Sequence, residues 1–90
     1  MQVENRMERF VMDNLDGVLK GYPHCCTCTE CRRDIVILAL NHLQPRYVST
    51  KMGDIYTRLN LYEAQEETEV IKEIAKAIQM VAKNPRHVKV

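Results

Sequence analysis

The sequence lacks a strong excess of charge of either sign, a long apolar run and a glycine-rich phosphate loop. Its 90 residues include 13 basic and 12 acidic side chains, which give a formal net charge of +1. A charge so close to neutral creates no general attraction for nucleic acid or anionic lipid, so direct DNA binding is not expected. The longest apolar run, from Ile35 to Leu40, is far shorter than the roughly 20 residues of a membrane-spanning helix, so no membrane partner is expected.

The residue types that enzymes use for catalysis do not form a recognisable group. The three histidines, His24, His42 and His87, are scattered along the chain. No serine, histidine and aspartate follow the spacing of a hydrolase motif. His42 is expected to be a partly exposed helix residue, and His87 lies in a basic tail. We therefore expect a protein that is not an enzyme.

The length of the chain suits one domain that spans residues 1–90. Apolar residues make up 46% of the sequence and charged residues 28%, a balance typical of a folded protein. Because a domain this small leaves much of its surface in water, a bound metal or a partner subunit is a reasonable expectation. The N-terminal residues are amphipathic rather than apolar, so we expect no signal peptide and a cytoplasmic protein.

The spacing of apolar residues predicts an all-α fold of about four helices, with a zinc-binding loop between the first two. The expected helices span residues 3–20, 30–43, 54–61 and 63–83. Thr29 is the expected N-cap of the second helix, and Gly53-Asp54 is expected to form a turn before the third. Residues 46–50 are rich in β-branched and aromatic side chains, which favours an extended segment.

The second expected helix is apolar on most of its sides, and the first carries a broad apolar stripe. One layer of a 90-residue chain is too small to cover both surfaces fully. A second copy of the chain would cover the remainder, so the sequence predicts a homodimer.

Four cysteines lie within seven residues, at Cys25, Cys26, Cys28 and Cys31. Two-residue spacing lets thiolates turn toward one ion, and zinc takes four such ligands in a tetrahedron. Soft thiolates select zinc or an iron–sulfur cluster over magnesium or calcium. Zinc is favoured because Lys20, Arg32, Arg33 and the amino end of the second helix would balance the negative charge of a four-thiolate site. Four sulfurs close the coordination shell, which indicates a structural ion.

Other interpretations of the cysteines remain open. Cys25 and Cys26 are adjacent, and neighbouring side chains usually diverge. Both bind one ion only where the backbone bends sharply; otherwise His24, water or a ligand from another chain replaces one of them. A disulfide that acts as a redox switch is less favoured, because the expected compartment is reducing. Inert thiols are less favoured still in so dense a group.

A second candidate site follows the second expected helix. Pro45 fixes a turn that holds Arg46 and Tyr47 side by side. Arginine binds phosphate through its planar fork, and tyrosine offers a face on which a base can stack. The pair therefore suits a nucleotide. The alternative is that Tyr47 packs on the core and Arg46 pairs with an acid.

Several sequence blocks together resemble one protein family. The blocks are Cys26-Thr-Cys-Thr-Glu-Cys-Arg32, Asp34, Leu40-Asn-His-Leu-Gln-Pro-Arg-Tyr-Val48, Met52-Gly-x-Ile-Tyr56 and Val81-x-x-Asn-Pro-Arg-His87. In this order they resemble the late competence development protein ComFB and its bacterial relatives. The resemblance implies a small, helical, dimeric and zinc-binding protein that is encoded among the competence genes for DNA uptake.

The resemblance also bears on the nucleotide hypothesis. Some cyanobacterial relatives act as receptors for cyclic dinucleotides, which supports Arg32, Arg46 and Tyr47 as ligand-binding residues. Relatives often have Pro-Pro before Arg-Tyr, whereas this chain has Gln44-Pro45. The favoured function is a zinc-binding regulatory or adaptor protein associated with genetic competence. The alternative is a cytoplasmic receptor for a cyclic dinucleotide of the c-di-GMP type.

Overall fold

The computed structural model describes residues 2–59 and 64–85. In chain order these residues form β1 (Val3–Asn5), α1 (Arg6–Leu19), α2 (Thr29–Asn41), β2 (Tyr47–Ser49), α3 (Thr50–Leu59) and α4 (Ala64–Lys83). Four helices are therefore present in the described part of the chain, as the apolar spacing predicts. The all-α prediction is incomplete, because the structure adds a small two-stranded sheet. Within the described residues, no helix is both long enough and apolar enough to cross a membrane.

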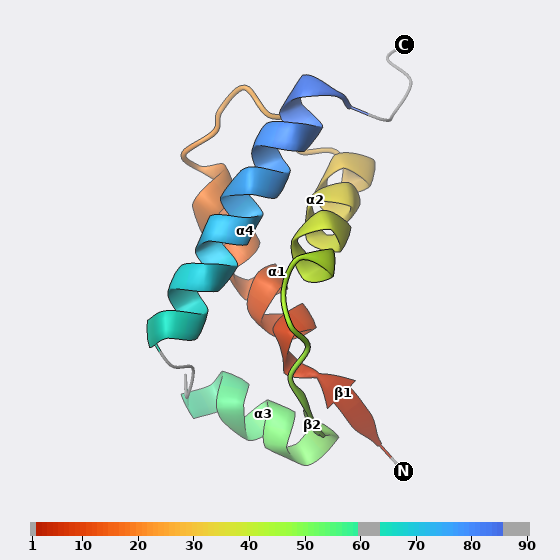
Figure 1. Cartoon of the computed structure of the whole chain (residues 1–90), viewed down its shortest axis with the longest axis vertical. Helices are drawn as coiled ribbons and strands as arrows, with labels where there is room; N and C mark the ends of the chain where they lie inside the picture. The colour runs from red at the N-terminus through yellow and green to blue at the C-terminus, as the bar shows by residue number, and fades with distance from the viewer. Residues whose placement is uncertain (1, 60–63, 86–90) are drawn as a thin grey trace.

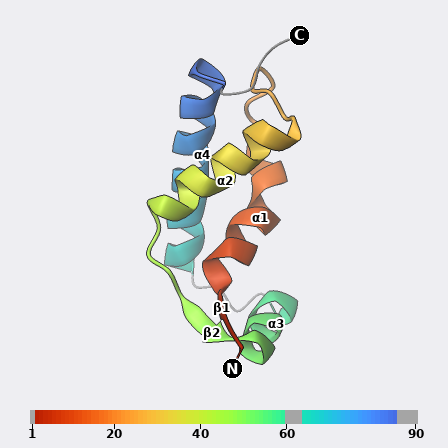
Figure 2. The ribbon, with the colours of Figure 1, turned by 90° about the vertical axis from the view of Figure 1, so that its right-hand side faces the viewer.

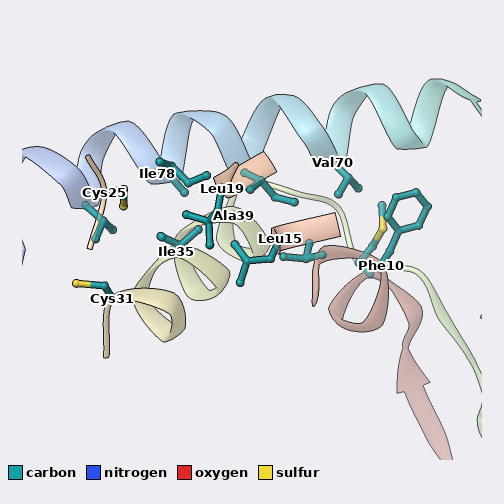
Figure 3. Close-up of a cluster of buried hydrophobic side chains, with 14 residues drawn as sticks. Phe10, Leu15, Leu19, Cys25, Cys31, Ile35, Ala39, Val70 and Ile78 are labelled. Carbon is teal, nitrogen blue, oxygen red and sulfur yellow. The ribbon is translucent and has the colours of Figure 1, made fainter. Parts of the chain in front are cut away.

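Helices α1, α2 and α4 pack together as a three-helix bundle, and α3 lies beside the sheet at one end of it (Figure 1). Figure 2 shows α2 in front, with α1 and α4 behind it on either side. In the close-up of Figure 3, Ile35 of α2 and Phe10 of α1 face Ile78 and Val70 of α4. The buried apolar core comes from all three helices: Met7, Phe10, Val11, Leu15, Leu19, Ile35, Ala39, Val70, Ile74, Ala77, Ile78 and Val81.

The first helix begins later than its apolar spacing predicts, because residues 3–5 form a strand. β1 pairs antiparallel with β2, so that Glu4 lies opposite Val48. The Asn5 side-chain oxygen accepts hydrogen bonds from the backbone N–H of Met7 at 3.1 Å and of Arg46 at 2.8 Å. The first of these bonds caps α1 and the second joins it to the segment before β2. The prediction of an extended segment at residues 46–50 is confirmed for β2.

The third helix also departs from the prediction, since it begins at Thr50. Gly53 and Asp54 lie inside α3, so the predicted turn there is wrong. A Cβ atom at residue 53 would overlap the carboxylate of Glu4. Gly53 therefore allows close packing of α3 against β1 rather than a turn. The predicted end of this helix, Leu61, lies outside the described residues.

The boundaries of α2 differ from the prediction at both ends. Its N-cap is Cys28 rather than Thr29, and it ends at Asn41 rather than Leu43. His42 follows as the C-cap and is exposed, with Nδ1 2.8 Å from the carbonyl oxygen of Leu38. The last helix, α4, matches the predicted range of 63–83 closely. The cysteines therefore lie in the α1–α2 connection and in the first turn of α2.

A partly buried ion pair ties the start of α1 to the start of α4. Arg6 donates two hydrogen bonds of 2.7 Å to the two carboxylate oxygens of Glu66. The Arg6 guanidinium also lies over the ring of Tyr56, 4.8 Å from its centroid. Such two-bond arginine–carboxylate pairs are strong and directional. The pair joins α1 to α4, and the contact with Tyr56 joins α1 to α3.

Candidate metal centre

Three of the four cysteines form a compact group of sulfur atoms. The Sγ atoms of Cys26, Cys28 and Cys31 all lie within 4.8 Å of one another. In a tetrahedral zinc site with sulfurs at about 2.3 Å from the metal, neighbouring sulfurs are about 3.8 Å apart. The three thiols can therefore close on one ion with small side-chain movements. Thiolates are soft ligands, so the chemistry of the group fits zinc.

The amino end of α2 positions this group. Cys28 caps the helix, and its Sγ accepts a hydrogen bond from the backbone N–H of Cys31 at 3.4 Å. Cys31 lies in the first turn and is only 1% exposed, whereas Cys28 is exposed and Cys26 is half-buried. The N–H groups of the first turn and the helix dipole give this end of α2 a partial positive charge that favours thiolates. An ion bound here would join the α1–α2 connection to the helix.

The local environment affects the thiols in opposite ways. The N–H of Cys31 lowers the pKa of the Cys28 thiol. Burial and the neighbouring sulfurs raise the pKa of Cys31 to about 12. Zinc displaces the proton from a coordinating thiol, so ion binding reverses the effect of burial at Cys31. Before an ion binds, Cys28 therefore ionises more readily than the buried Cys31.

Cys25 lies outside the group, although the sequence predicts it as a ligand. Its side chain is 7% exposed and belongs to the hydrophobic core, and burial raises the pKa of its thiol. The Cys25 Sγ donates a hydrogen bond of 3.5 Å to the carbonyl oxygen of Cys26. Figure 3 shows Cys25 beside α4, while Cys31 comes from the start of α2. The side chains of the adjacent Cys25 and Cys26 thus diverge, and a four-cysteine site stays a prediction. His24 is exposed and remains an alternative fourth ligand.

Arg32 joins the two helices that flank the cysteines. Its guanidinium forms an ion pair with Asp16 of α1 at 2.7 Å, and the Arg32 side chain is 39% exposed. Arg33 is exposed beside it. Both cations lie within two residues of Cys31, as the sequence requires. Their charge can offset part of the negative charge of a thiolate site.

The predicted nucleotide-binding residues do not come together in one place. Arg32 lies at the amino end of α2, whereas Arg46 and Tyr47 lie beyond its carboxyl end. The Arg46 Nε is 3.9 Å from the carboxylate of Glu66, as the pairing alternative predicts. Tyr47 is 68% exposed, so the alternative in which it packs on the core is wrong. Arg46 lines a polar hollow of about 390 Å³, whose other lining residues are His42, Leu43, Gln44, Glu69, Lys72 and Glu73.

The comparisons with known proteins agree with one another. A family model described as late competence development protein ComFB matches residues 4–85. Competence protein ComFB of Bacillus subtilis (strain 168) is 28% identical over 81 residues, which cover 90% of this chain and 83% of that protein. A solved structure of the late competence protein ComFB from Bacillus subtilis is similar with a TM-score of 0.80 and 26% identity. That match covers 97% of this chain and 96% of the solved one.

Proposed function

This chain belongs to the late competence development protein ComFB family, and on that premise we propose that it is a non-enzymatic, zinc-binding regulatory or adaptor protein of genetic competence. The observation that carries the proposal is the group of three sulfurs within 4.8 Å of one another. These thiols come from a loop and from the helix that follows it. Their arrangement suits a structural ion that holds the two segments together.

Zinc would supply a cross-link that the small core lacks. Cys31 is buried one turn before Ile35, which is fully buried between the helices. Holding Cys31 to Cys26 and Cys28 therefore fixes the loop and the first turn of α2 relative to the core. Zinc that binds only the folded chain stabilises it by the free energy of binding.

Metal analysis of protein kept reduced throughout purification tests this function. We expect about one zinc ion per chain and a lower melting temperature after chelation. Reduced protein that contains no zinc, and that takes up none when zinc is added, would overturn the proposal. Thermal unfolding of the metal-loaded and chelated protein in the same buffer provides the control.

A receptor for a cyclic dinucleotide is the second candidate, and the exposure of Tyr47 favours it. Tyr47 is 68% exposed beside Arg46, which lines the polar hollow with Lys72. A base could stack on the ring while the cations bind phosphate. Calorimetry with c-di-GMP tests this candidate: Arg46→Ala should weaken binding about tenfold to a hundredfold without loss of zinc. Wild-type protein that produces no heat with any cyclic dinucleotide removes this function.

We also propose that the chain forms a homodimer, with its sheet end as the contact in place of the apolar sides of the first two helices on which the sequence prediction is based. Three apolar side chains there are well exposed: Val3 at 58%, Met52 at 43% and Leu59 at 61%. An exposed apolar patch can serve as an interface between subunits. Light scattering should give twice the chain mass of 10.5 kDa, and Val3→Asp should shift the protein toward the monomer. A wild-type monomer at micromolar concentration would reject the dimer.

A further inference from the structure

The outer side of α2 forms a ridge between two apolar grooves. One groove, of about 300 Å³, lies between α1 and α2 and is lined by Met12, Val36 and Ile37 among others. The other, of about 350 Å³, lies between α2 and α4 and is lined by Ile37 and Met80. Because Ile37 lines both grooves, they form one continuous surface, which we call the α2 face. This face is turned toward the viewer in Figure 2.

The apolar side chains of the α2 face are unusually accessible. Met12 is 62% exposed, Ile37 48% and Met80 53%. One exposed apolar side chain is ordinary, but three that line adjoining grooves indicate a binding surface. Met12 belongs to α1 and Met80 to α4, so each lines its groove from the helix opposite α2. Methionine is flexible and adapts to the shape of a partner.

The charges along the two grooves have a predominant sign. Their lining includes three cations, Arg32, Arg33 and Lys83, and one carboxylate, Asp34. Arg32 is paired with Asp16. Among the residues that the structure describes, no ion pair engages Arg33 or Lys83. The edge of the α2 face therefore favours a partner with acidic side chains.

We propose that the α2 face docks an amphipathic helix of another protein, with an apolar stripe for the grooves and an acidic flank for Arg33 and Lys83. Helices pack against each other by placing the side-chain ridges of one into the grooves of the other. Apolar side chains at positions i, i+3, i+4 and i+7 of the partner would enter the grooves. The acidic flank would set the orientation of the helix and exclude basic competitors.

The proposal rests on the proposed adaptor function and gives the metal a specific role in it. Cys28 caps α2 and Cys31 lies in its first turn. Thr29, Arg32 and Arg33, from the first two turns of the same helix, line the α1–α2 groove. An ion that holds the cysteines therefore also holds this wall of the groove. Chelation is expected to weaken partner binding even at temperatures where the bundle stays folded.

A displayed library of helical peptides tests the proposal on the full-length, zinc-loaded protein. Each peptide carries a fixed leucine stripe at i, i+3, i+4 and i+7, with Glu or Lys randomised along its flanks. We expect selected peptides to be enriched in Glu. In anisotropy titrations, Ile37→Asp and Arg33→Glu should each weaken their binding at least about tenfold. Replacing the flanking Glu by Lys should restore binding to the Arg33→Glu protein.

Ile71→Asp is the matched control, because Ile71 is a partly exposed residue elsewhere on α4, at 38%. It should leave peptide binding unchanged. Met80→Glu provides a second test of the grooves should Ile37→Asp lower the helix content measured by circular dichroism.

Four results would overturn the proposal. The first three are no enriched peptide, enrichment of basic flanks, and binding that is insensitive to both Ile37→Asp and Met80→Glu. The fourth is that the α2 face binds something else, which is shown if Ile37→Asp dissociates a homodimer or abolishes binding to phosphatidylglycerol vesicles. Failure of the adaptor's zinc site is seen separately, in the metal content. Zinc-loaded protein without peptide binding rejects only the docking surface. Zinc-free protein that binds the acidic peptides rejects the zinc function and the role of the metal in docking, but not the docking surface.

Discussion

The end of the bundle that carries the cysteines can be compared with the end that carries the two-stranded sheet. At the cysteine end, the Sγ atoms of Cys26, Cys28 and Cys31 lie within 4.8 Å of one another. At the sheet end, Arg6 and Glu66 share two hydrogen bonds of 2.7 Å, and their side chains are only 11% and 12% exposed. The first group joins the α1–α2 connection to the start of α2, and the second joins α1 to α4.

The two ends should therefore respond to different perturbations. Thiols lose a metal through chelation or oxidation, and neither treatment removes charge from Arg6 or Glu66. A carboxylate–guanidinium pair is instead weakened by neutralising one partner. Salt should have a small effect on it, because partly buried pairs are screened much less than exposed ones. With zinc bound, the domain would combine one stabilising contact that depends on metal supply and redox state with another that needs only side chains of the chain.

The largest expected effect comes from breaking the cysteine end. Cys28→Ser should reduce bound zinc from about one per chain to near zero. The lost metal should lower the free energy of unfolding by at least about 3 kcal/mol. For a domain of this size, that corresponds to a fall in melting temperature of roughly 12–24 °C. Metal analysis and calorimetric melting measure the two effects.

Thr27→Ser is the matched control for Cys28→Ser, since Thr27 is an exposed neighbour in the same loop. It should change neither the zinc content nor the melting temperature. A Cys28→Ser protein that keeps both its zinc and its wild-type melting temperature would show that Cys28 is not a ligand.

Breaking the sheet end should have the next largest effect. Glu66→Gln keeps the shape of the side chain but removes the carboxylate that pairs with Arg6 at 2.7 Å and, at 3.9 Å, with the more exposed Arg46. Removing one partner of a buried pair is costly, and for this partly exposed pair we expect about 2–4 kcal/mol. Urea unfolding measures the change, and zinc content should stay the same. The exposed neighbour Glu67 provides the control, because Glu67→Gln should change stability by less than about 0.5 kcal/mol.

A double substitution sharpens the interpretation of the sheet end. Arg6→Met combined with Glu66→Leu removes both charges and should recover most of the lost stability. Recovery would show that the isolated charge, rather than lost packing, causes the effect of Glu66→Gln. A double variant as unstable as the single one would contradict this explanation.

The smallest effect is expected from a change at Cys25. This variant distinguishes a cysteine that packs in the core from the cysteines that form the sulfur group. Cys25 packs in the core outside the sulfur group. Cys25→Ala should therefore retain zinc and lower stability by about 1–2 kcal/mol through the cavity it leaves. The adjacent Cys26→Ala should lose zinc. If Cys25→Ala also loses its zinc, the four-cysteine site that the sequence predicts is correct, and the core position of Cys25 changes on metal binding.

The sequence predicts those parts of the structure that depend on local spacing. Apolar residues that recur every three or four positions indicate α1 and α4, because one face of each helix must be buried. The short spacing of Cys26, Cys28 and Cys31 similarly indicates that their thiols gather. The role of Cys28 as the N-cap of α2 is less visible, because cysteine is not among the residues that usually cap helices.

The parts that the sequence does not predict depend on contacts between distant residues. Strand β1 forms because Val3 pairs with Ser49, and no local pattern in residues 3–5 distinguishes a strand from the start of a helix. Gly53 lies inside α3, where the carboxylate of Glu4 occupies the space that a Cβ atom would need. The Arg6–Glu66 pair joins residues that are 60 positions apart. Such contacts become visible only when the whole fold is known.

The different sequence separations at the two ends have a consequence for the order of folding. Bringing Cys26, Cys28 and Cys31 together closes a loop of only a few residues, whereas the Arg6–Glu66 contact closes most of the chain. Short loops close faster and at a lower entropic cost. During synthesis, the three cysteines also leave the ribosome before α4 has been made. A nascent chain supplied with zinc would therefore begin to fold at its cysteines, and the sheet end would assemble last.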